Sequence, residues 1–123
     1  MSAKLGKSVL CIGSEPVSLN FRCSLLKQNG WVVLSAGSGH EGVLRFEREK
    51  VDAIVVDLND DGSEAALITA ALKKIRPDIP VIMLVSPDRQ LAVGATSQAD
   101  AVLPKSQETG RLNDVLTGLT RCN

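Results

Sequence analysis

VDAIVVDLN, residues 51–59, combines a continuous apolar run with a carboxylate at its end. The apolar residues are continuous rather than alternating, which is typical of a strand in a parallel sheet that is covered on both faces. Asp57 follows this run directly. A carboxylate that ends a buried strand lies at the rim of the sheet, where ligands and phosphoryl groups bind. Asp57 is therefore the first candidate site residue.

Similar apolar runs and helical patterns alternate along the rest of the chain. We expect strands over residues 9–12, 31–34, 53–56, 81–85 and 101–103. We expect helices over residues 16–29, 41–50, 63–75 and around 112–119, with a short, weak helix over 88–97. Five such units predict an α/β fold, with a doubly wound parallel sheet between two layers of helices.

The first predicted helix, residues 16–29, carries its apolar side chains on one side. Val17, Phe21, Leu25 and Leu26 fall on one helical face. We therefore expect this face to pack against the sheet.

Length, charge and cysteine content limit the possible functions. The 123 residues fit a single domain spanning residues 1–123. Lys plus Arg and Asp plus Glu number 14 each, a balance that predicts no nucleic-acid partner. No apolar run approaches the roughly 20 residues of a membrane span, and no signal peptide is expected. Cys11, Cys23 and Cys122 lack metal-site spacing and indicate reduced thiols in a cytoplasmic protein.

The residues just after each strand decide the function of a doubly wound sheet, because the binding crevice lies at the carboxyl ends of the strands. Five short segments lie there: Gly13-Ser14-Glu15, Ser35-Ala36-Gly37, Asp57-Leu58-Asn59, Ser86-Pro87 and Pro104-Lys105. Among them, Asp57 and Lys105 are the only charged pair that we expect to meet over the sheet.

Together these segments resemble the receiver domain of two-component response regulators. The resemblance runs from about residue 8 to residue 119. It rests on five segments that follow one another along the chain: NGW (29–31), AGSGHE (36–41), VDAIVVDLN (51–59), PVIML (80–84) and ADAVLPK (99–105). It implies a flavodoxin-like (βα)₅ domain with the strand order 2-1-3-4-5. It also implies a non-enzymatic role in two-component signal transduction, as a phosphoprotein in a phosphorelay.

The resemblance assigns a role to each candidate site residue. Asp57 is the phosphoacceptor for a histidine kinase, and Lys105 pairs with Asp57 and then with a phosphoryl oxygen. Asn59 offers its backbone carbonyl to Mg²⁺, which Asp57 also binds. Glu15 is a weak candidate third ligand, and Ser86 is a candidate phosphoryl contact.

Several positions depart from the family pattern. Gly13 and Ser14 stand where the family has its acidic pair, although Mg²⁺ usually takes ligands from carboxylates. Val85 replaces a Thr or Ser that contacts the phosphoryl group, and Val102 stands where a switch aromatic is common. We therefore interpret the chain as a degenerate receiver, or pseudo-receiver, in which the Mg²⁺ site is doubtful and Asp57 serves mainly as the ionic partner of Lys105.

This interpretation predicts a domain that acts through protein–protein interaction, with weak or no Mg²⁺-dependent phosphorylation at Asp57. Its partner would be a histidine kinase or another signalling protein, without a membrane or small-molecule ligand. We expect the interacting face to include Asp88, Arg89, Gln90, Gln107, Arg111 and Asn113. The alternative is a conventional phosphoacceptor that recruits Glu15 to hold Mg²⁺.

A further alternative comes from GSGHEG, residues 37–42, which matches the G-x-G-x-x-G pattern of nucleotide-binding loops. The segment follows a predicted strand and opens a predicted helix. Against this alternative, too little chain follows for a substrate domain, and the receiver resemblance explains the same glycines. His40, within this loop, is the only histidine, and we expect it to be exposed.

Overall fold

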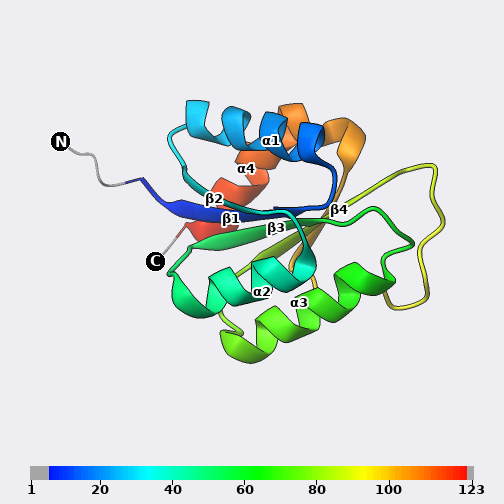
Figure 1. Cartoon of the computed structure of the whole chain (residues 1–123). Helices are drawn as coiled ribbons and strands as arrows, with labels where there is room; N and C mark the ends of the chain where they lie inside the picture. The colour runs from blue at the N-terminus through cyan, green and yellow to red at the C-terminus, as the bar shows by residue number, and fades with distance from the viewer. Residues whose placement is uncertain (1–5, 122–123) are drawn as a thin grey trace.

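A parallel sheet forms the centre of the computed structural model, which describes residues 6–121 (Figure 1). Its strands are β1 (Ser8–Gly13), β2 (Val32–Ala36), β3 (Ala53–Asp57), β4 (Val81–Val85) and β5 (Ala101–Pro104). They lie in the order β2-β1-β3-β4-β5, and every adjacent pair is parallel. The predicted flavodoxin-like topology is confirmed.

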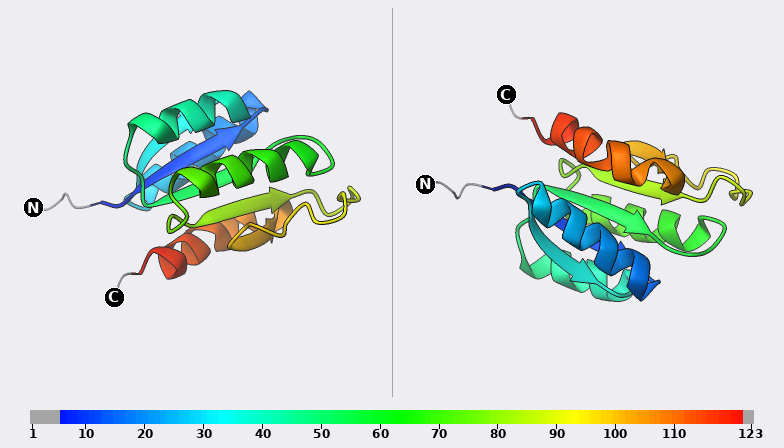
Figure 2. Two further views of the ribbon diagram at one scale, coloured as in Figure 1. Left: turned by 90° about the horizontal axis from the view of Figure 1, so that it is seen from below. Right: turned by 90° about the horizontal axis from the view of Figure 1, so that it is seen from above.

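Helices cover both faces of this sheet. They are α1 (Pro16–Gln28), α2 (Gly39–Arg48), α3 (Ser63–Ile75) and α4 (Glu108–Thr120), with a short 3₁₀ turn over Lys105–Gln107. Helices α1 and α4 lie on one face, and α2 and α3 lie on the other, as the views in Figures 1 and 2 agree. Within residues 6–121, none of these helices is both long and apolar enough to cross a membrane.

Strand β1 shows how the sequence builds two cores around one sheet. Successive side chains of a strand point to opposite faces. Val9 and Cys11 accordingly pack in the cluster with α1 and α4, whereas Leu10 and Ile12 pack in the cluster with α2 and α3. All four are fully buried, which explains why the sequence of this strand is continuously apolar.

The predicted buried face of α1 is right at Leu26 but wrong at Val17 and Phe21. Val17 and Phe21 are 74% and 53% exposed, and the buried residues of the helix are Leu19, Arg22, Cys23 and Leu26. The buried residues follow the helical spacing i, i+3, i+4, i+7 from Leu19. Because one of these buried residues is an arginine, a search for apolar residues alone did not identify the buried face.

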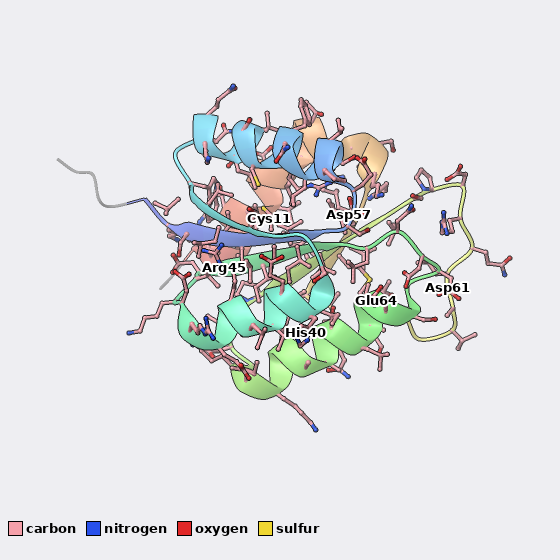
Figure 3. The ribbon with its side chains drawn as sticks, viewed as in Figure 1. Cys11, His40, Arg45, Asp57, Asp61 and Glu64 are labelled. Carbon is pink, nitrogen blue, oxygen red and sulfur yellow. The ribbon has the colours of Figure 1, made fainter. Side chains whose placement is uncertain are left out.

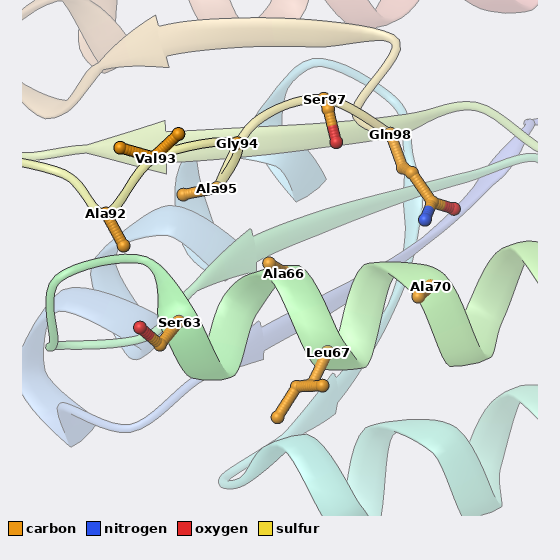
Figure 4. Close-up of a pocket in the computed structure, with 10 residues that line it drawn as sticks. All are labelled: Ser63, Ala66, Leu67, Ala70, Ala92, Val93, Gly94, Ala95, Ser97 and Gln98. Atoms are coloured by element: carbon orange, nitrogen blue, oxygen red, sulfur yellow. The ribbon is translucent and has the colours of Figure 1, made fainter.

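The short helix predicted over residues 88–97 is also wrong. The chain between β4 and β5 runs through turns instead, with Gly94 in the left-handed region at φ 77°. The Ala92 N–H donates to the carbonyl of Asp61, 2.8 Å away, rather than to a preceding helical turn. This segment therefore lies against the start of α3. An open groove of about 450 Å³ lies between this segment and α3, and four of its ten lining residues are alanines (Figure 4).

Other local predictions agree with the structure. Trp31 is only 8% exposed, and its Nε1–H donates to the side-chain oxygen of Asn113, 2.7 Å away. Cys11 and Cys23 are free and buried. A hydrogen bond with the Cys23 thiol, together with burial, raises the pKa of Cys11. Cys122 lies outside the described residues.

Candidate functional site

Asp57 ends the central strand β3 and lies at the carboxyl edge of the sheet, below the first turn of α1 (Figure 3). Gly13, the last residue of β1, is its register partner on the neighbouring strand. The side chain of Asp57 is only 3% exposed. A carboxylate with so little contact with water needs charged or hydrogen-bonding partners from the protein.

Lys105 supplies the first partner. Its Nζ lies 2.9 Å from Oδ1 of Asp57, an ion-pair distance, and its side chain is 30% exposed. Lys105 directly follows β5, so the parallel sheet brings the two strand ends to the same edge. The meeting of Asp57 and Lys105 predicted from the sequence is present in the structure.

Arg22 is the second partner of Asp57, and the sequence analysis did not find it. Its Nη2 lies 2.8 Å from Oδ2 of Asp57 and 3.0 Å from Oε1 of Glu108, the first residue of α4. The Arg22 side chain is 1% exposed. One buried guanidinium therefore joins α1, β3 and α4. We refer to Arg22, Asp57 and Glu108 as the buried ionic triad.

The surroundings of Arg22 keep it charged. Burial acts to lower the pKa of Arg22, but the hydrogen bond with Glu108 and the negative charges of Glu108 and Asp57 outweigh burial and raise that pKa. Nε and Nη1 of Arg22 are buried, and the described residues offer them no hydrogen-bond acceptor. Arg22 is thus a permanent cation, and two of its nitrogens, which carry three N–H bonds, are left without an acceptor among the described residues.

The remaining predicted site residues lie around this centre. The hydroxyl oxygen of Ser14 accepts a bond from the backbone N–H of Asn59, 3.3 Å away. Ser86 lines a small hollow together with Asn59 and Lys105. Val85 has no hydroxyl and pairs in register with Pro104. The structure thus gathers Ser14, Asn59, Ser86 and Lys105 at one edge of the sheet.

The side chain of Glu15 interacts locally, with the helix that follows it. Its Oε1 accepts the backbone N–H of Ser18, 2.8 Å away, and so caps the N-terminus of α1. This hydrogen bond from Ser18 is the main cause of the lowered pKa of Glu15.

Titration of Glu15 gives a pH prediction. Because the folded-state pKa lies below the ordinary value of 4.5, the cap stabilises the fold above that pH, and its contribution is lost as pH falls through the lowered pKa. We expect the Glu15 carboxyl resonance in NMR to titrate below 4.5. In Ser18→Pro, which removes the donor N–H, the midpoint should move upward. An unchanged midpoint would contradict the capping role.

The side chains around Asp57 do not provide a set of oxygen ligands that fits a divalent metal ion. Mg²⁺ requires a near-octahedral set of oxygen ligands. Oδ2 of Asp57 faces Arg22, Glu15 caps a helix, and Gly13 and Ser14 bring no carboxylate. Over residues 6–121, no three His, Cys, Asp or Glu side chains are grouped so that they could hold a metal.

Packing explains two of the three glycines of the GSGHEG segment. A Cβ on Gly39 would lie 2.5 Å from Ile68, and one on Gly42 would lie 2.4 Å from Ile12. These two glycines therefore allow α2 to pack closely on α3 and β1. His40 is exposed in the first turn of α2, as predicted.

The sheet order and a strand-end aspartate paired with a lysine after the fifth strand together define a receiver-type signalling domain. The comparison of sequences agrees, since the family model described as "Response regulator receiver domain" matches residues 9–117. The chain belongs to this family.

Curated relatives are longer proteins. The transcriptional regulatory protein GlrR of Escherichia coli K12 is 35% identical over 94 residues, which cover 73% of this chain and 20% of that protein. The probable transcriptional regulatory protein TcrX of Mycobacterium tuberculosis is 25% identical over 100 residues, covering 80% of this chain and 43% of TcrX. The chain thus spans about a fifth of the length of GlrR and less than half of TcrX.

Solved structures share the fold at low sequence identity. The response regulator TrrA of Thermotoga maritima, in complex with Mg²⁺-BeF, has a TM-score of 0.82 at 20% identity, covering 92% of this chain and 98% of that one. The receiver domain of the sensor histidine kinase PA1611 of Pseudomonas aeruginosa, with magnesium in its active-site cleft, has a TM-score of 0.78 at 20% identity, covering 94% and 98%.

Proposed function

We propose that this chain is a pseudo-receiver, a single non-enzymatic signalling domain over residues 1–123 that acts by binding a partner protein. In this proposal Asp57 is phosphorylated weakly or not at all in the presence of Mg²⁺. The partner is a histidine kinase or another signalling protein in the cytoplasm. Nucleic acid, membranes and small molecules are not its ligands.

One observation carries the proposal: both carboxylate oxygens of Asp57 face a cation from the chain itself, Arg22 on Oδ2 and Lys105 on Oδ1. A carboxylate nucleophile must reach a phosphoryl group in line with the leaving oxygen. Asp57 is 3% exposed and would have to give up an ion pair to do so. This arrangement supports a structural role for Asp57.

The residues around the site support the same proposal. Val85 cannot donate a hydrogen bond to a phosphoryl oxygen, and Val102 is 44% exposed instead of filling a switch position. The interacting face proposed from the sequence lies on the segment after β4 and on α4. Within it Asp88, Arg89, Gln90, Gln107 and Arg111 are exposed, while Asn113 is half-buried against Trp31.

The alternative, a conventional phosphoacceptor, is favoured by the ion pair between Lys105 and Asp57. That pair is what the family resemblance assigns to phosphorylation. In this alternative Asp57, the carbonyl of Asn59 and Glu15 would hold Mg²⁺. Glu15 would then have to leave the N–H of Ser18, which it now accepts.

The first experiment is intact mass after incubation with acetyl phosphate, with and without Mg²⁺. We expect no phosphoryl adduct, because Arg22 holds Oδ2 of Asp57 and the Asp57 side chain is only 3% exposed. Asp57→Asn serves as the matched control, since any adduct on another residue would persist in it. An Mg²⁺-dependent adduct that disappears in Asp57→Asn would contradict the proposal and favour the conventional phosphoacceptor.

A further inference from the structure

We infer that Arg22 is the permanent counter-cation of Asp57 and that its guanidinium excludes a divalent metal ion from this site. The inference rests on the proposed function and names Arg22 as the residue that prevents Mg²⁺ from binding. The cation beside Asp57 would be a side chain of the protein itself. The site would therefore hold a cation at any Mg²⁺ concentration.

Charge balance is the first argument. Asp57 and Glu108 contribute two negative charges, and Arg22 and Lys105 contribute two positive ones. Two cations at close range repel each other strongly where water is excluded. A divalent ion on Asp57 would therefore meet an already neutral cluster and a buried guanidinium beside it.

Position is the second argument. A Cβ built on Gly13 would lie 3.5 Å from Nη1 of Arg22, and Gly13 is the register partner of Asp57. The guanidinium thus occupies the space between the ends of β1 and β3. By the family resemblance, an acidic pair at Gly13 and Ser14 would hold the metal at these strand ends. The buried cation Arg22 therefore lies where the family has its acidic pair and this chain has Gly13 and Ser14.

Immobility is the third argument. Glu108 holds Nη2 of Arg22 from the start of α4 at 3.0 Å, and the side chain is 1% exposed. Moving Arg22 aside would separate it from two carboxylates at once, leaving buried Glu108 without its ion-pair partner and Asp57 with Lys105 alone. Such a separation is costly, so the guanidinium would not yield its place to a solvated ion.

The test restores one missing carboxylate and compares metal binding with and without Arg22. Ser14 is exposed and its hydroxyl is directed to Asn59, so Ser14→Asp places an acid at the site without disturbing the core. The proteins compared are wild type, Ser14→Asp and Ser14→Asp with Arg22→Gln. Ser24→Asp, on the exposed face of α1, controls for the added charge. Binding is followed by NMR shifts of the Asp57 and Asn59 amides during a MgCl₂ titration at constant ionic strength.

We expect no saturable shift in wild type or Ser24→Asp. Binding in the double variant should be about tenfold tighter than in Ser14→Asp, because a buried like charge has been removed. The inference is overturned if wild type binds Mg²⁺, if Ser14→Asp binds as tightly as the folded double variant, or if the folded double variant does not bind.

A second measurement on wild type decides the matter if the double variant does not fold. The Nη–H groups of a buried, ion-paired guanidinium should give separate, slowly exchanging NMR signals that Mg²⁺ does not alter. A single, rapidly exchanging signal for Arg22 would overturn the inference.

The outcomes also separate this inference from the proposed function. Phosphorylation of Asp57 that does not require Mg²⁺ would refute the proposed function and leave Arg22 as the cation. Mg²⁺ binding by wild type without phosphorylation would do the reverse.

Discussion

Replacement of Arg22 by leucine should lower the free energy of unfolding by about 3–5 kcal/mol, the usual cost of removing one partner from a buried ion pair. The carboxylates of Asp57 and Glu108 would remain, 3% and 7% exposed, without the guanidinium that neutralises them. The measurement is urea unfolding followed by the fluorescence of Trp31, the only tryptophan.

Two matched variants make this prediction specific. Arg45→Leu removes a partly exposed arginine that pairs with Glu49 and donates to the carbonyl of Ser35, and it should cost less than about 1 kcal/mol. Asp57→Asn should cost less than Arg22→Leu, because Arg22 keeps Glu108 and Lys105 reaches water. Equal losses in Arg22→Leu and Arg45→Leu would mean that the buried ionic triad contributes nothing beyond a surface ion pair.

Gly42→Val is expected to lower the free energy of unfolding by about 1–3 kcal/mol, because overpacking a filled core forces neighbours from their preferred positions. The new Cβ alone would lie 2.4 Å from Cδ1 and 2.6 Å from Cγ1 of Ile12, which is fully buried. Thermal or urea unfolding measures the change.

Gly118→Ala is the matched control. A Cβ at Gly118, on the exposed side of α4, would meet nothing within 4 Å. This variant should raise stability by about 0.5–1 kcal/mol, since alanine loses less backbone entropy in a helix. If Gly42→Val kept wild-type stability, the packing explanation of the GSGHEG glycines would fail. A nucleotide that raised the melting temperature of wild type would then revive the alternative of a nucleotide-binding loop.

Strong local patterns were read correctly from the sequence. Helix α3 and strand β4 occur over the predicted residues, 63–75 and 81–85. Continuous apolar strands and helical spacing arise from contacts within a few residues, so a single sequence reveals them. The segment between β4 and β5 was misread, because its course depends on a hydrogen bond from Ala92 to the distant Asp61.

The sequence by itself determined the parallel sheet, the place of Asp57 at its edge and the meeting of Asp57 with Lys105, because strand ends in such a sheet converge whatever the side chains. Only the tertiary structure decided the second cation. Arg22 reads as an ordinary polar residue of α1, and its partners lie 35 and 86 residues away in the chain. Burial of a guanidinium is tolerable only where carboxylates from other elements meet it, and that meeting exists only in the folded protein.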